Sequence, residues 1–242
     1  QSSYESSSPS EALGVPSVIG YALRGGVPAL PVAIAPPESA SVGPLALGDV
    51  NGDGRLDLFV GARVIPGTWP FPAPSRLYLR TADGRFVADS ANAKVLASLG
   101  LLSSALFADL DGDGWPELIV AAEWGPVRIL HNERGRFRDV TRDWGMTGLT
   151  SRWNGLAVGD FDGDGRLDLV ATSWGLNVPW AATAERPYEL VVGHFGAGGP
   201  GLLFARRDSL TGREMPLESF SRLGVVLPSV RDRIASFADY AK

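Results

Sequence analysis

An acidic nine-residue pattern occurs three times in this chain, and it constrains the fold more than any other feature. The best-formed copy runs from Asp160 to Asp168, with carboxylates at its first, third, fifth and ninth positions and glycines at its fourth and sixth. The other copies run from Asp49 to Asp57 and from Asp109 to Glu117. Carboxylates this close repel one another unless a cation offsets their charge. Three copies of one ligand pattern rarely arise by chance.

The segments around each copy have the character of short β-strands. Residues 155–159 lead into the third copy and residues 169–171 lead out of it, and both segments are small or apolar. The 30 glycines and 18 prolines favour many short strands joined by turns. Repeats of roughly 40–50 residues with four strands each are typical of propeller blades. We therefore predict an all-β chain of about four propeller-type blades with a short C-terminal helix.

The repeats also predict how the chain is divided. Residues 1–41 form an N-terminal extended segment, residues 42–212 hold blades that start near 42, 103, 154 and 188, and residues 213–242 form a helical tail. In the fourth repeat the turn His194–Leu202 keeps its glycines and has no carboxylate, so we expect it to bind no metal. In an open propeller the edge strands would be unpaired, so they could pair with strands of further blades or of a partner chain.

The composition excludes several classes of protein. The net charge is −5, and 11 of the 27 acidic residues lie in the three copies, which argues against a nucleic-acid partner. There is no cysteine, which excludes disulfides and thiolate metal sites. No apolar run reaches the roughly 18 residues of a membrane span.

The residue types in the pattern indicate which cation it would bind. Oxygen ligands at positions one, three, five and nine, with a backbone carbonyl at position seven, suit Ca²⁺, and we expect one ion in each loop, about three in all. An EF-hand needs a carboxylate at position twelve, where this chain has Val60, Val120 and Ala171. Open loops of this kind need millimolar Ca²⁺, which predicts a secreted, periplasmic or cell-surface protein. A structural role for the ion is favoured, because it would allow a tight acidic turn to close.

These residues resemble the FG-GAP or VCBS repeat, found in integrin α-subunit propellers and in many exported bacterial proteins. The resemblance covers residues from about 42 to 205 and rests on the acidic loops and on the small-residue patches that follow them, such as Val60-Gly61-Ala62. Residues 105–117 and 156–168 look most like the bacterial branch that is often associated with ASPIC/UnbV domains. The resemblance implies a propeller, of seven blades in the family, with Ca²⁺ in the loop between the first two strands of a blade. Four copies are fewer than seven, so the chain is either a fragment of a larger propeller or a ring that closes unusually.

Carried onto this sequence, the resemblance implies five ligands in each loop, four from side chains and one from the carbonyl of the seventh residue. The implied ligands are Asp49, Asn51, Asp53, Arg55 and Asp57; Asp109, Asp111, Asp113, Trp115 and Glu117; and Asp160, Asp162, Asp164, Arg166 and Asp168. Glu117 departs from the family pattern, since its longer side chain replaces an aspartate.

The function expected from this pattern is a binding or adhesion module of an exported protein, with a protein or glycan as its unidentified ligand. The alternatives are a structural spacer within a larger exported protein and, less favoured, a polysaccharide-acting enzyme. No nucleophile or phosphate-binding motif occurs, so we expect no enzymatic activity. The two histidines are His131 and His194, and His131 is predicted to be a surface residue near a turn.

Overall fold

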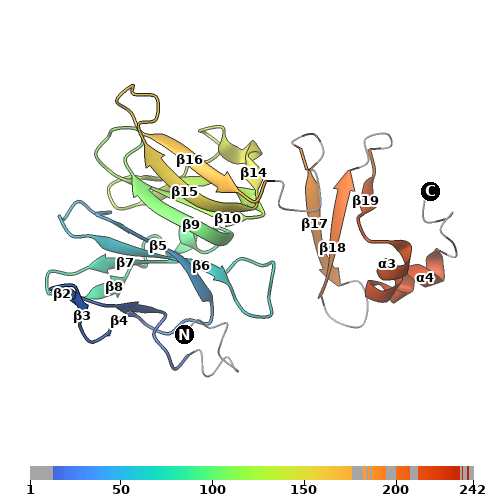
Figure 1. The fold of residues 1–242 in the computed structure, drawn as a ribbon, viewed down its shortest axis with the longest axis horizontal. Helices are drawn as coiled ribbons and strands as arrows, with labels where there is room; N and C mark the ends of the chain where they lie inside the picture. Colours follow the sequence, from blue (N-terminus) through green and yellow to red (C-terminus); the bar gives the residue numbers. More distant parts are fainter. Residues whose placement is uncertain are drawn as a thin grey trace. The chain divides into compact units, whose positions relative to one another are not determined.

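The computed structural model describes residues 13–175, 182–183, 185, 187–194, 200–207, 212–234, 236 and 239. The chain divides into two compact units, Gln1–Asn177 and Val178–Lys242. Antiparallel sheets are the main regular structure of both units, and two short helices follow the last described strand (Figure 1). The expected all-β fold with propeller-like blades is confirmed.

The first unit contains the strands β1 to β16, the short helix α2 and the 3-10 helix η1. Their bounds are β1 Val18–Gly20, β2 Leu23–Arg24, β3 Val27–Pro28, β4 Val32–Ala35, β5 Ser41–Gly48, β6 Asp57–Val64, β7 Arg76–Arg80, β8 Phe86–Ala88, α2 Ala93–Leu96, β9 Leu101–Ala108, β10 Glu117–Glu123, β11 Gly125–Pro126, β12 Arg128–Asn132, β13 Phe137–Asp139, η1 Met146–Gly148, β14 Thr150–Ser151, β15 Trp153–Gly159 and β16 Asp168–Ser173.

Two four-stranded sheets repeat the same strand order. The first is β5-β6-β7-β8 and the second is β9-β10-β12-β13, and every neighbouring pair within them is antiparallel. Among the described residues the third sheet consists of β15 and β16 alone. The pairs β1-β4, β2-β3 and β11-β14 are small additional sheets. Each large sheet is therefore one blade, with an acidic loop between its first two strands.

The blades stack through their first two strands. Strand β9 lies against β5 on one side and β15 on the other (Figure 1). Side chains alternate between the two faces of a strand, so on β10 Leu118 and Val120 enter the core shared with the first blade, while Ile119 enters the core shared with the third. Burying a side chain of this size stabilises the fold by about 1.5–3 kcal/mol. Strand β10 is thus buried on both faces.

A buried amide also connects the first two blades. The side chain of Asn132, at the end of β12, is fully buried and donates a hydrogen bond to the carbonyl of Val50 at 3.0 Å. Its Oδ1 accepts a bond from the N–H of Gly135 at 2.7 Å, so both ends of the amide are satisfied. These bonds hold the β12–β13 hairpin of the second blade against the acidic loop of the first.

The second unit has a small core of its own. Its elements are β17 Tyr188–His194, β18 Pro200–Arg207, β19 Glu214–Pro216, α3 Phe220–Val226 and α4 Pro228–Arg233. Strands β17, β18 and β19 form an antiparallel sheet, and a buried cluster of Leu203, Leu223 and Leu227 joins the sheet to the helices. Most of the predicted metal-free turn His194–Leu202 lies outside the described residues. None of the described helices is long and apolar enough to cross a membrane.

Candidate metal centre

The three acidic copies form equivalent loops between the first and second strands of their sheets. We call them loop 1 (49–57, between β5 and β6), loop 2 (109–117, between β9 and β10) and loop 3 (160–168, between β15 and β16). In each loop the first residue directly follows a strand and the ninth residue begins the next strand. The register pairs the residue before the loop with the ninth residue, as in Gly48 with Asp57. The pattern therefore closes a hairpin within its own length.

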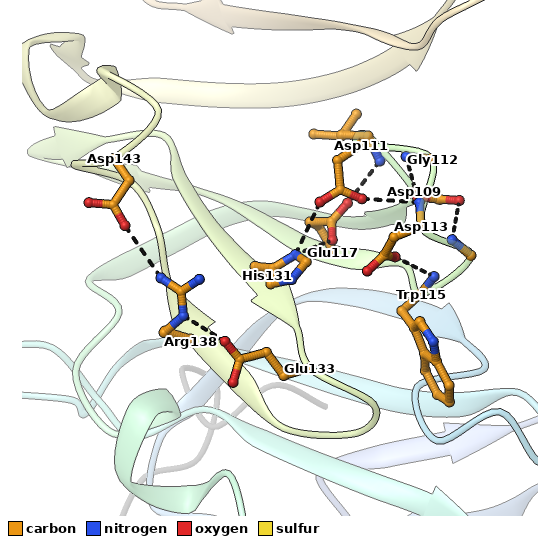
Figure 2. Close-up of polar contacts among 12 residues, drawn as sticks. Asp109, Asp111, Gly112, Asp113, Trp115, Glu117, His131, Glu133, Arg138 and Asp143 are labelled. Carbon is orange, nitrogen blue, oxygen red and sulfur yellow. Dashed lines mark hydrogen bonds and ion pairs between the residues drawn. The ribbon is translucent and has the colours of Figure 1, made fainter.

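The first aspartate of each loop accepts three backbone N–H bonds. In loop 2, Oδ1 of Asp109 accepts from Gly112 and Asp113 at 2.9 and 3.1 Å, and Oδ2 accepts from Gly114 at 2.9 Å (Figure 2). Asp49 and Asp160 accept the same three bonds in their loops. The backbone reaches this arrangement because Gly112 and Gly114 adopt left-handed φ angles of 78° and 87°, which glycine tolerates best.

The other acidic positions also accept backbone bonds. In loop 2, Asp111 accepts from the N–H of Asp113 at 3.2 Å, and Asp113 accepts from that of Trp115 at 2.8 Å. Glu117 accepts from the N–H of Leu110 at 2.8 Å. Loops 1 and 3 repeat these three contacts at the same positions. Each ionised carboxylate can accept about four hydrogen bonds, so oxygen lone pairs are left over for a cation.

Carboxylates at positions one, three and nine converge. In loop 2 and in loop 3 these three side chains each place one oxygen within 4.8 Å of the other two. The residues are Asp109, Asp111 and Glu117 in loop 2, and Asp160, Asp162 and Asp168 in loop 3. Loop 1 has an amide, Asn51, at the third position, between the carboxylates of Asp49 and Asp57. Loops 2 and 3 therefore contain acidic clusters that could hold a metal ion.

In loops 1 and 3 the residues at positions five and seven form ion pairs with each other. Asp53 pairs with Arg55 at 2.5 Å in loop 1, and Asp164 pairs with Arg166 at 2.5 Å in loop 3. The position-five carboxylates of these two loops are thus already matched with a positive charge from position seven. Such exposed pairs contribute little to stability, about 0–1 kcal/mol, so a cation could displace the arginines at low cost. The seventh-position carbonyls of Arg55, Trp115 and Arg166 stay a prediction.

Loop 2 has an additional polar neighbour that is less exposed than the sequence interpretation predicted. His131 lies near the end of strand β12, next to the hairpin turn as predicted, but only 19% of its side chain is exposed, so it is half-buried and not a surface residue. Its Nδ1 lies 3.0 Å from Oε1 of Glu117 and 3.3 Å from Oδ2 of Asp111 (Figure 2). His131, Asp111 and Asp113 form a third group whose ligand atoms lie within 4.8 Å of one another. The sequence did not reveal the contact between His131 and Glu117, because this contact depends on the pairing of β10 with β12.

Two buried carboxylates begin the second strands of the first two blades. Asp57 is fully buried, and burial raises the pKa of its carboxyl group. The N–H groups of Arg80 and Val50 lower this pKa, whereas the nearby charges of Asp53 and Asp49 raise it. Burial also raises the pKa of the fully buried Glu117, against the lowering effect of its hydrogen-bond donors.

The raised pKa values have a direct consequence for stability. Because the folded pKa of Asp57 and of Glu117 lies above the unfolded value, protonation of these groups favours the metal-free fold at low pH. That contribution is lost as the pH rises through the folded pKa, and the ionised groups then carry a cost. A bound cation would offset this cost by favouring the charged form.

Loops 1 and 2 also touch each other. A Cβ atom placed on Gly52 of loop 1 would lie only 2.7 Å from the Cη2 atom of Trp115 in loop 2. Gly52 has a left-handed φ of 73°. The indole of the second blade therefore packs directly on the turn of the first, so the geometry of one loop depends on the other.

The chain was compared with known proteins. A family model described as an FG-GAP-like repeat matches residues 49–120 and 109–171, which together span just over half of the 242 residues. Each match begins at the first aspartate of a loop and ends within the strand that directly follows the next loop, β10 in one case and β16 in the other. A search of curated proteins finds no match to this chain.

The contact between the loops predicts different effects for two equivalent glycines. Gly52→Ala and Gly112→Ala both place a side chain at a left-handed φ, which costs about 1–2 kcal/mol. Only Gly52→Ala also displaces the Trp115 ring, since nothing lies within 4 Å of a Cβ on Gly112. We expect Gly52→Ala to lower the free energy of unfolding by about 1–3 kcal/mol more than Gly112→Ala, measured by urea denaturation. Equal losses would show that the indole does not pack on loop 1.

Proposed function

The chain belongs to the FG-GAP-like repeat family, and on that premise we propose that it is a calcium-stabilised binding module of an exported protein. The observation that carries the proposal is the repeated loop geometry. The same hydrogen bonds recur in all three loops and aim the oxygens at positions one, three and nine at one point in loops 2 and 3. The proposal gives the loop carboxylates a role in cation binding and assigns no catalytic step to the chain.

Calcium is the cation that suits this scaffold best. It takes six to eight oxygen ligands in flexible geometry at about 2.3–2.6 Å. Positions one, three, five and nine, the carbonyl of position seven and water would supply such a shell in each loop. The ion would neutralise the repulsion among the carboxylates and stabilise the hairpin that starts the second strand. We therefore propose one Ca²⁺ in each loop, with a mainly structural role.

Exposed apolar side chains on the loops support a binding role. Leu56 in loop 1 is 50% exposed, and in loop 3 Phe161 and Leu167 are 60% and 41% exposed. Loops on a rigid scaffold commonly carry the residues that contact ligands. We propose that the calcium ions fix the loop backbones and that these exposed side chains contact a protein or glycan ligand. An exported location fits this role, since weak open sites fill at millimolar extracellular Ca²⁺.

Calcium is expected to raise the melting temperature of the chain. At a Ca²⁺ concentration 100 times the dissociation constant, each site stabilises the fold by about 2.7 kcal/mol. For a chain of this size that corresponds to roughly 5–10 °C per site, measured by calorimetry against EDTA with Mg²⁺ at matched ionic strength as the control. Equal melting temperatures in Ca²⁺ and EDTA would contradict the proposal.

A pair of variants assigns the effect to the loops. Asp162→Ala removes a carboxylate from the converging group of loop 3 and should reduce the number of bound Ca²⁺ ions by one. Asp143→Ala makes the same charge change at a side chain outside the loops that is 64% exposed, and it should leave the number unchanged. Calcium counted by equilibrium dialysis distinguishes the two, and equal loss in both variants would indicate a general charge effect.

A binding module and a spacer differ in whether the isolated chain has a ligand. We expect the calcium-loaded chain to give a reproducible hit on an array of glycans and peptides. The hit should weaken in Phe161→Ser, which removes the exposed ring of loop 3, and persist in Val87→Ser, which changes a side chain of similar exposure on β8. The absence of any hit in Ca²⁺ would instead favour a structural spacer.

A further inference from the structure

Loop 2 differs chemically from the other two loops. Its ninth residue is the glutamate Glu117, and the register of β10 with β12, continued by one residue from the pair Leu118 and Leu130, places His131 opposite it. In the first blade the same register places Leu79 opposite Asp57. The second blade therefore has an imidazole where the first has a hydrocarbon side chain, and the longer glutamate reaches it.

The imidazole points into the loop. Figure 2 shows His131 extending from β12 toward the carboxylates of Glu117 and Asp111. Its Nδ1 lies 3.0 and 3.3 Å from one oxygen of each. Two ligands bound at about 2.1 Å to one metal ion are separated by about 3.0 Å in an octahedron and about 3.4 Å in a tetrahedron. The distance from Nδ1 to each of the two oxygens is therefore one that neighbouring ligands of a small divalent ion adopt.

A hydrogen bond alone satisfies this arrangement incompletely. Nδ1 of a neutral imidazole carries at most one proton, and two carboxylate oxygens compete for it. One of them belongs to Glu117, whose side chain is fully buried. A divalent cation at this point would bind Nδ1 and both oxygens and would neutralise two carboxylates at once. Imidazole is a common ligand for Zn²⁺ and its first-row neighbours, whereas Ca²⁺ takes oxygen ligands.

The site is open on one side. A cavity of about 370 Å³ borders it and is lined by Asp113, Trp115, His131, Asn132, Glu133 and Arg134. Asp113 also belongs to the converging group with Asp111 and His131, so its carboxylate faces the same region. In loops 1 and 3 an arginine at position seven pairs with the fifth carboxylate, whereas loop 2 has the uncharged Trp115 there. The cavity gives a metal ion a way in and leaves space for water ligands.

We propose that loop 2 selects a first-row transition metal ion of the Mn²⁺ to Zn²⁺ series over Ca²⁺, with His131 as its nitrogen ligand and Asp111, Asp113 and Glu117 as oxygen ligands. The inference rests on the proposed function only in that the loop holds a divalent cation. Loops 1 and 3 keep all-oxygen ligand sets and remain calcium sites. Ca²⁺ occupies loop 2 when no transition metal is present.

Competition between metals tests this assignment. The full chain, without a polyhistidine tag and saturated with Ca²⁺, is titrated with Zn²⁺ by calorimetry. It should bind one equivalent of Zn²⁺ and release one Ca²⁺. With Co²⁺ as the probe, a hyperfine-shifted, exchangeable imidazole N–H resonance should appear in the proton NMR spectrum, because a ligating histidine keeps its other ring proton.

A histidine-specific pair of variants identifies the ligand. His131→Gln retains a side chain that can donate to Glu117 and replaces the nitrogen ligand with an oxygen. It should lower Zn²⁺ affinity at least about tenfold, remove the shifted resonance and leave the number of bound Ca²⁺ ions unchanged, which also shows that the variant folds. His194→Gln changes the chain's other histidine and should match the wild type.

The outcomes separate this inference from the calcium proposal. Undiminished Zn²⁺ binding by His131→Gln would overturn the inference and leave His131 as a hydrogen-bond partner of Glu117 only. Failure of Zn²⁺ to displace Ca²⁺ from the wild type would overturn it as well, while leaving the calcium proposal in place. Zn²⁺ binding that depends on His131 in a chain that binds no Ca²⁺ would support His131 as a metal ligand, and it would reject both the calcium proposal and the selection of Zn²⁺ over Ca²⁺.

Discussion

The fold depends on a turn in which one aspartate accepts three backbone N–H bonds. Asp49, Asp109 and Asp160 each make these bonds to the fourth, fifth and sixth residues of their loops. The bonds reverse the chain and align the first strand of each sheet with the second. They also leave several carboxylates close together. The turn that closes the hairpin thus also creates a possible cation site.

Contacts between neighbouring blades connect these turns to one another. Strand β10 is buried on both faces because a neighbouring blade covers each one. Trp115 packs on Gly52, and Asn132 bonds to the carbonyl of Val50, so parts of the second blade brace the acidic loop of the first. An ion that rigidified one loop would therefore stabilise its neighbour as well. Cation binding and blade packing are expected to be cooperative for this reason.

The sequence predicted the local features well and the non-local ones poorly. Nine residues contain all the information needed to place the acidic loops, their glycines and the flanking strands, and the family resemblance was confirmed over residues 49–171. The exposure of His131 was predicted wrongly, because its burial depends on the register between β10 and β12, which places its side chain beside Glu117. The ion pairs of Asp53 and Asp164 were not foreseen either, since Arg55 and Arg166 were considered only for their carbonyls.

The central claim is that the three loops are cation sites and not merely acidic turns. The most direct measurement is anomalous difference density from crystals of this chain grown with Ca²⁺ and without transition metals. The account predicts one peak in each loop, within bonding distance of the side chains at positions one, three and nine. Loops with the same hydrogen bonds and no peak in any of them would contradict it, because the N–H bonds would then suffice to hold the carboxylates together.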